Sequence, residues 1–256
     1  MKTFLILLLI IVLVLLYNCF YETFENTDNN IELVIARYNE DLEWTTQEPF
    51  NKYKYIVYNK GKNENFNKTN VKEIIPVKNV GRCDHTYLYH IINNYDNLGN
   101  IVVFLPGSLD MTLKKMIGKH LLNTIEEKNK AIFLGLHTTD IKKAFNDFKI
   151  DEWKASYGPN SEENNESKLL LSPNRPFGKW FENYFGDIKV NVHCYYGIFS
   201  IDKRDIIKHP VSRYQHLIKD LETHSNPEVG HYFERGWGAV FYPMEHTEFK
   251  QYISFF

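Results

Sequence analysis

The sequence predicts an α/β fold: a single layered domain with a mostly parallel central sheet, preceded by an N-terminal transmembrane helix. Apolar runs of strand length alternate with amphipathic helical stretches through most of the chain. The run at residues 101–105 is entirely apolar, as expected of a strand buried on both faces. An uninterrupted apolar segment also stands close to the start of the chain, at residues 4–16.

Strands are expected where Val, Ile and aromatic residues gather between turn signals. These segments are residues 31–38, 53–58, 71–77, 101–105, 131–136 and 190–201. Helical periodicity and start or stop signals predict helices at residues 81–96, 112–128, 210–223 and 228–242, with short ones near 141–148 and 178–185. Pro76 predicts that the third strand lies at a sheet edge, because proline cannot donate a ladder hydrogen bond.

Residues 4–21 are just long and apolar enough to cross a bilayer. Lys2 precedes this segment and acidic residues follow it, so the bulk of the chain should be lumenal or extracellular. We therefore expect a signal anchor at residues 1–21, a polar stem at 22–30 and one lumenal domain at 31–256. This describes a single-pass protein of the secretory pathway or of a virion membrane. A cleaved signal peptide is the alternative, but no small-x-small cleavage site follows.

Composition and missing motifs exclude several classes of function. The net charge of -2 gives no field that attracts nucleic acid, so no nucleic-acid partner is expected. The chain has no GxGxxG, GxxxxGK[ST], GxSxG or HExxH motif, which argues against dinucleotide, P-loop, α/β-hydrolase and zincin sites. Cys83 and Cys194 could form a disulfide in an oxidising compartment or remain two free buried thiols.

Polar side chains follow the first predicted strand directly, and a basic residue begins the first long helix. Arg37, Asn39 and Asp41 stand where α/β enzymes bind ligands, at the carboxyl end of a strand; a solvated turn is the alternative. Arg82 follows the helix-opening Gly81, where free N–H groups and a guanidinium can bind phosphate. The alternative for Arg82 is a first turn that faces solvent.

Two carboxylates are candidates for chemistry. Glu234 shares a helical face with His231 and could act as a general base toward a hydroxyl; the alternative is a surface ion pair with Arg235. Asp110 follows the central strand, where a divalent metal, Mn²⁺ or Mg²⁺, would need oxygen ligands. The alternative for Asp110 is a polar residue at a Pro-Gly turn. A hydrolase that uses both carboxylates would need them close together.

Five motifs resemble, in order and spacing, an uncharacterised family of fungal, algal and large-virus proteins. The matching strings are VIARYNEDLEW, IVYNKG, NVGRCDHTYLYHIINNYDNL, VVFLPG, and YGIFSIDKRDIIKHP with HYFERGWGAVF. Cys83 stands where that family usually has an acidic residue. The layout also resembles GT-A-type glycosyltransferases, in which the first strand holds a nucleotide, the central strand exit meets the diphosphate and a late acidic helix faces the acceptor.

This resemblance implies a membrane-anchored glycosyltransferase that moves a sugar from a nucleotide sugar to a hydroxyl of a glycan or protein acceptor. The implied catalytic residues are Glu234 and Asp110, with Asp110 also the metal ligand. The residues implied to bind the nucleotide sugar are Arg37, Asn39, Asp41, Arg82 and Gly107. No DxD stands at the strand exit, which favours the alternative: a non-catalytic glycan- or protein-binding module on a degenerate transferase fold.

Overall fold

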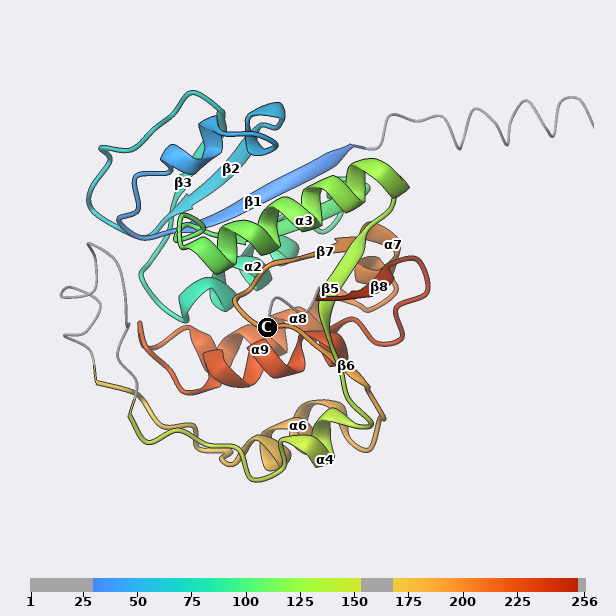
Figure 1. The fold of residues 1–256 in the computed structure, drawn as a ribbon. Coiled ribbons are helices and arrows are strands. Elements are labelled where there is room, and N and C mark those ends of the chain that lie inside the picture. The colour runs from blue at the N-terminus through green and yellow to red at the C-terminus, as the bar shows by residue number, and fades with distance from the viewer. Residues whose placement is uncertain (1–29, 153–167, 253–256) are drawn as a thin grey trace, which may run out of the picture. The chain divides into compact units, whose positions relative to one another are not determined.

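The computed structural model describes residues 30–152 and 168–252, and the part from Ile31 onward forms one unit around a central sheet (Figure 1). The expected signal anchor at residues 1–21 and nearly all of the stem lie outside the described ranges. Within those ranges, no helix has both the length and the apolar character needed to cross a membrane.

The central sheet has five strands in the order β3-β2-β1-β4-β7. Its strands are β1 (Ile31–Arg37), β2 (Tyr55–Asn59), β3 (Val71–Pro76), β4 (Ile101–Pro106) and β7 (Phe199–Asp202). The first four run parallel, and β7 pairs antiparallel with β4. The predicted α/β class with a mostly parallel central sheet is therefore confirmed, as is the edge position of the strand that ends at Pro76.

A smaller sheet has the order β6-β5-β8. Its strands are β5 (Ile132–His137), β6 (Val192–His193) and β8 (Glu248–Gln251). The single strand predicted at residues 190–201 is wrong, because the chain divides it between β6 and β7, which belong to different sheets. Tyr196 and Gly197 have positive φ angles of 67° and 64°, and this left-handed turn redirects the chain between the two sheets.

Seven helices and three 3₁₀ turns are described. The helices are α2 (Arg82–Asn93), α3 (Thr112–Lys128), α4 (Ile141–Ala144), α6 (Phe177–Phe185), α7 (Lys203–Ile207), α8 (Val211–Leu217) and α9 (Val229–Val240). The 3₁₀ turns are η1 (Glu43–Thr46), η2 (Phe50–Lys52) and η3 (Ile218–Leu221). The helix predicted at 210–223 is thus an α-helix followed by a 3₁₀ turn, and α7 was not predicted.

Alternating strand residues divide the core between the two faces of the central sheet. Leu33 and Ile35 of β1 pack with Leu121 and other residues of α3. Val34 of β1 packs with residues of α2, α8 and α9, including Tyr87. Helix α3 therefore covers one face and α2 the other, with α9 beyond α2 (Figure 1).

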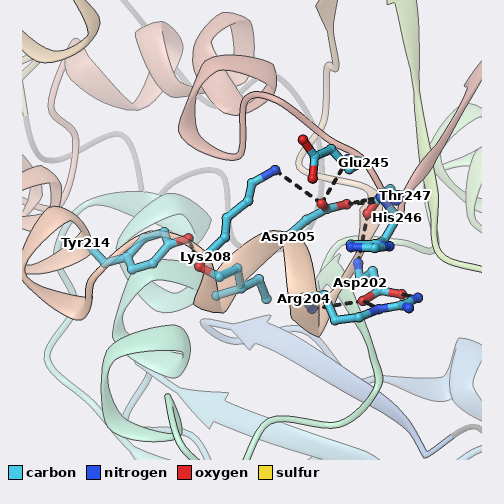
Figure 2. A network of polar contacts seen from close by, with 9 residues as sticks. Asp202, Arg204, Asp205, Lys208, Tyr214, Glu245, His246 and Thr247 are labelled. Atoms are coloured by element: carbon cyan, nitrogen blue, oxygen red, sulfur yellow. Dashed lines mark hydrogen bonds and ion pairs between the residues drawn. The ribbon is translucent and has the colours of Figure 1, made fainter.

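A buried carboxylate fixes the turn that leads into β8 (Figure 2). Asp205 of α7 accepts hydrogen bonds from the backbone N–H groups of Glu245 at 2.9 Å, His246 at 3.1 Å and Thr247 at 2.7 Å. The Lys208 ammonium lies 3.2 Å from the same carboxylate. Burial alone would raise the pKa of Asp205, but these hydrogen bonds outweigh it and the pKa is lowered.

We expect Asp205→Asn to lower the free energy of unfolding at neutral pH by about 1–3 kcal/mol, because an amide cannot accept all of these bonds. The lowered pKa means that the stability from Asp205 is present above the ordinary aspartate value of 3.8 and lost as the pH falls through the folded-state value. Urea denaturation of wild type and variant should therefore converge on acidification. A difference that is constant with pH would contradict this assignment.

Candidate functional site

The candidate site lies at the carboxyl ends of β1 and β4, where the order of the parallel strands changes direction. The chain passes from β1 to β2 on one side, and from β3 back to β4 on the other. Ligands of open α/β sheets bind at such a switch point. A Cβ atom on Gly107, just after β4, would lie 2.7 Å from Oε2 of Glu40, so the Glu40 carboxylate lies directly over this glycine. The Tyr38 N–H donates to the same oxygen at 2.7 Å.

The buried side chain of Arg37 holds the loop after β1 in place through hydrogen bonds. Its side chain is fully buried. Its guanidinium donates to the backbone oxygen of Glu40 at 2.7 Å, to Oδ1 of Asn59 at 2.6 Å and to the backbone oxygen of Asn63 at 2.6 Å. It also stacks on the ring of Phe66, with its central carbon 4.1 Å from the ring centroid. Contact between Arg37 and a nucleotide remains a prediction, and the contacts seen fix the loop that carries Glu40.

The other two predicted loop residues lie farther along the same turn. Asp41 is exposed, and its Oδ1 accepts the N–H of Glu43 at 3.0 Å. Asn39 lies against Gly61, where an added Cβ would be 2.4 Å from the Asn39 Oδ1. The structure therefore brings Asn39 to the loop after β2, while Asp41 remains at the surface.

Arg82 points from the start of α2 toward α9. Its backbone φ is 52°, and its carbonyl oxygen accepts from the Lys60 ammonium, which also donates to the backbone oxygen of Val80 at 2.6 Å. The guanidinium lies 3.2 Å from Oδ1 of Asn226 and 3.2 Å from Nε2 of His231. Burial lowers the pKa of Lys60 to about 8. Arg82 therefore belongs to a polar cluster with residues of and near α9, and the alternative of a first turn that only faces solvent does not describe it.

His231 connects Arg82 to Glu234. Nδ1 of His231 lies 3.6 Å from Oε2 of Glu234, on the ring side opposite to Arg82. Burial alone would raise the pKa of Glu234, but the interaction with His231 and the charges of Arg82 and Arg235 outweigh it and lower the pKa. Burial lowers the pKa of His231. Glu234 is therefore an ionised, partly buried carboxylate at neutral pH, as a general base requires.

Arg235 holds α9 against the preceding segments. Its guanidinium lies 3.5 Å from the ring centroid of Phe148 and 5.4 Å from those of Phe145 and Tyr195. It donates to the backbone oxygen of His231 at 2.8 Å. Its distance from Glu234 is 4.0 Å, so the aromatic contacts dominate its surroundings.

Asp84 adds a second carboxylate near Glu234, and the sequence did not single it out. It is almost fully buried, and its Oδ1 accepts from the Trp237 indole N–H at 2.9 Å. Burial and the charge of Glu234 raise the pKa of Asp84 to about 7. The only hint of Asp84 in the sequence was the spacing of Glu234 and Trp237 on one helix. Asp84 comes to lie beside these two residues only through the packing of α2 on α9.

We expect Asp84→Asn to raise the thermal midpoint in mild alkali and to lose this advantage in mild acid. The raised pKa means that the folded state binds a proton more tightly than the unfolded chain. The stability from Asp84 therefore falls as the pH rises from the ordinary aspartate value of 3.8 to about 7. Asparagine removes the buried charge and can still accept from Trp237. Melting curves measured from mildly acid to mildly alkaline pH would contradict the expectation if wild type were the more stable form in mild alkali.

Lys114, in the first turn of α3, was also missed. Its ammonium donates to Oγ of Ser108 at 2.7 Å. Burial lowers its pKa, while the charges of Glu40 and Glu234 oppose this effect and Arg82 adds to it. Lys114 therefore lies within electrostatic reach of the residues on both sides of the switch point. The signal in the sequence that could have indicated Lys114 was its position shortly after the central strand.

Asp110 is exposed in the turn after β4. Within residues 30–152 and 168–252, no group of three or more His, Cys, Asp or Glu side chains could hold a metal ion. A role for Asp110 as metal ligand or catalytic carboxylate remains a prediction.

Cys83 and Cys194 are both free thiols, which decides between the two alternatives left open above.

Comparison with known proteins gives one family. The family model described as "Protein of unknown function (DUF3431)" matches residues 33–252, which include the central sheet except for the first two residues of β1, and all of the candidate site. No curated protein matches the chain.

Proposed function

The chain belongs to the DUF3431 family of unknown function, and from this premise we propose that it is a membrane-anchored glycosyltransferase. The proposed reaction moves a sugar from a nucleotide sugar to a hydroxyl of a glycan or protein acceptor. The membrane would be reached through residues 4–21, with the domain on the lumenal or extracellular side. The GT-A-like layout is part of this proposal, and the strand order β3-β2-β1-β4 with an antiparallel β7 supports it.

The arrangement of Arg82, His231 and Glu234 carries the proposal. It places an ionised carboxylate, a neutral imidazole and a guanidinium in one cluster. A glycosyl transfer needs a base for the acceptor hydroxyl and positive charge for the departing diphosphate. Glu234 would accept the proton of the acceptor hydroxyl, and Arg82 would bind the diphosphate.

The loop after β1 would hold the nucleotide. Arg37 fixes this loop by its hydrogen bonds to Asn59 and Asn63. Asn39 and Asp41 are the side chains of that loop proposed to contact the base or ribose. Gly107 is the backbone position proposed to lie near the diphosphate; the contact seen there is with the Glu40 carboxylate, which a side chain at this position would meet.

The test is to measure thermal stabilisation of the full-length protein by nucleoside diphosphates and nucleotide sugars, with and without Mn²⁺, and then release of the nucleotide in the presence of acceptor glycans. A ligand at 100 times its dissociation constant stabilises by roughly 2.7 kcal/mol. Stabilisation by one nucleotide together with turnover would support the transferase. Stabilisation by glycans without any nucleotide effect would favour the non-catalytic binding module, which needs neither a donor nor a metal ion.

A further inference from the structure

A cavity lies beside the start of α2, and its lining includes none of Arg82, His231 and Glu234. Its volume is about 390 Å³, within the range of roughly 300–1,000 Å³ that is usual for small-molecule sites. Three parts of the chain form its walls: the end of β3 with the residues that follow it, the first two turns of α2, and the residue after η3. The cavity is therefore a site of its own at the edge of the central sheet.

Gly81 brings these walls together. Its φ is 57°, and an added Cβ would lie 2.6 Å from the Cβ atoms of both His85 and Leu221. Its N–H donates to the backbone oxygen of His224 at 2.8 Å. The segment that carries Glu222 therefore packs directly on the first turn of α2, at a distance that only glycine allows.

His85 is the polar group in the inner wall of the cavity. The residue is only 6% exposed, and among the described residues its Nδ1 has no hydrogen-bond partner. Burial and the charges of Lys60 and Lys78 lower the pKa of His85 to about 4, so the imidazole is neutral at neutral pH. A buried imidazole with an unpaired nitrogen at the wall of a cavity favours a ligand that supplies a hydrogen bond.

The remaining lining combines apolar surface with two opposite charges. Val77, Val80 and the ring of Tyr89 supply the apolar part, and this ring lies at 25° to that of His85, with the centroids 5.9 Å apart. Lys78 and Glu222 are both exposed, so they bring one cation and one carboxylate to the lining. The cavity thus offers an aromatic ring, hydrogen-bond donors and hydrogen-bond acceptors, with no excess of either charge among its lining side chains.

A neutral sugar fits this lining better than an ion does. Glu222 would repel an anion, and Lys78 would repel a cation. A pyranose ring has an apolar C–H face, which can pack on an aromatic ring. Its hydroxyls both donate and accept, so they can bond to an imidazole, an ammonium and a carboxylate at the same time.

We propose that this cavity binds one neutral sugar residue of a glycan, through hydrogen bonds to His85 and Glu222 and packing on Tyr89. The inference goes beyond the proposed transfer, because it assigns a binding site outside the cluster of Arg82, His231 and Glu234. The two sites are neighbours in the chain. Lys60 donates to the carbonyl oxygens of both Val80, which lines the cavity, and Arg82, which belongs to the cluster.

The experiment is an NMR titration of the full-length protein, without any sugar-based detergent, with glucose, galactose, mannose and N-acetylglucosamine. Wild type should bind at least one of them. His85→Phe keeps an aromatic ring but loses the hydrogen bond, and should weaken binding roughly 2- to 10-fold. His216→Phe is the matched control, because His216 is exposed beside Tyr184, with ring centroids 5.1 Å apart, and does not line the cavity. It should bind as wild type does.

Glu222→Ala keeps the test decisive if His85→Phe is unstable, because an exposed side chain can be removed with little effect on folding. It should also weaken sugar binding, whereas Glu127→Ala, which removes an exposed carboxylate of α3, should not. Three results would each overturn the inference: no binding of any of the four sugars by folded wild type, binding by both cavity variants that equals wild type, or displacement of the bound sugar by inorganic phosphate.

The fate of this inference can be separated from that of the transferase. Sugar binding that His85→Phe weakens, in a protein that consumes no nucleotide sugar, would support the inference and count against the enzyme. Sugar transfer by a protein whose cavity variants bind sugars as wild type does would support the enzyme and overturn the inference.

Discussion

For the proposed sugar transfer, we expect Glu234→Gln to lower the turnover number about 10²- to 10⁴-fold, the range that one general base contributes. The amide keeps the shape of the side chain but cannot accept the proton of an acceptor hydroxyl. The pKa of Glu234 lies below that of an ordinary glutamate, so wild type retains its base from neutral into mildly acid pH. Initial rates with saturating donor and acceptor measure the effect.

Two comparisons make this result specific. Glu127→Gln on the exposed face of α3 removes the same charge and should leave the rate unchanged. Donor binding by Glu234→Gln, measured by calorimetry, should match that of wild type, since the proposed role is toward the acceptor. A variant that turns over at the wild-type rate would remove Glu234 from the mechanism.

Glu228→Ala lowers the free energy of unfolding by about 3–5 kcal/mol, the cost of removing one partner from a buried, charge-paired network. The Glu228 side chain is fully buried. It accepts from the backbone N–H of Ile150 at 3.1 Å, that of Ser172 at 2.8 Å and the Tyr232 hydroxyl at 2.9 Å, and lies 3.3 Å from the Arg175 guanidinium. Alanine leaves two backbone N–H groups, a hydroxyl and a guanidinium without this acceptor.

Urea denaturation measures this loss. Glu228→Gln keeps the size of the side chain and should lose less, about 1–3 kcal/mol. Asp187→Ala is the control for an exposed carboxylate; it breaks the ion pair with Lys142 at 2.9 Å and should leave the midpoint unchanged. Equal midpoints for Glu228→Ala and Asp187→Ala would show that the network adds nothing to stability.

Local patterns in the sequence were sufficient for most of the fold. Apolar runs predicted β1, β2, β3, β4 and β5, because each is a continuous strand with turn signals at its ends. The prediction of a single strand at residues 190–201 was wrong because a continuous apolar run does not show where the chain passes from one sheet to another. Strand β8 was missed because its polar residues, Glu248 and Lys250, give no apolar run, and its position depends on pairing with β5.

Arg82 was predicted because it begins a helix, whereas Glu234 was predicted because it shares a helical face with His231, and the structure brings both to His231. Asp84 was missed because its surroundings come from segments far apart in the chain. Burial of Asp84 against Trp237 is a tertiary contact, and no pattern within α2 reports it.

The contacts that join α2 to α9 span most of the chain: Arg82 and His231 are 149 residues apart, and Asp84 and Trp237 are 153 apart. During synthesis, the N-terminal strands and α2 are therefore made long before α9. A nascent chain would carry the cations Lys60 and Arg82 but not yet Glu234, the proposed base. The order of synthesis thus separates the residues proposed to bind an anion from the residue proposed to act on an acceptor, and the two come together only when α9 docks.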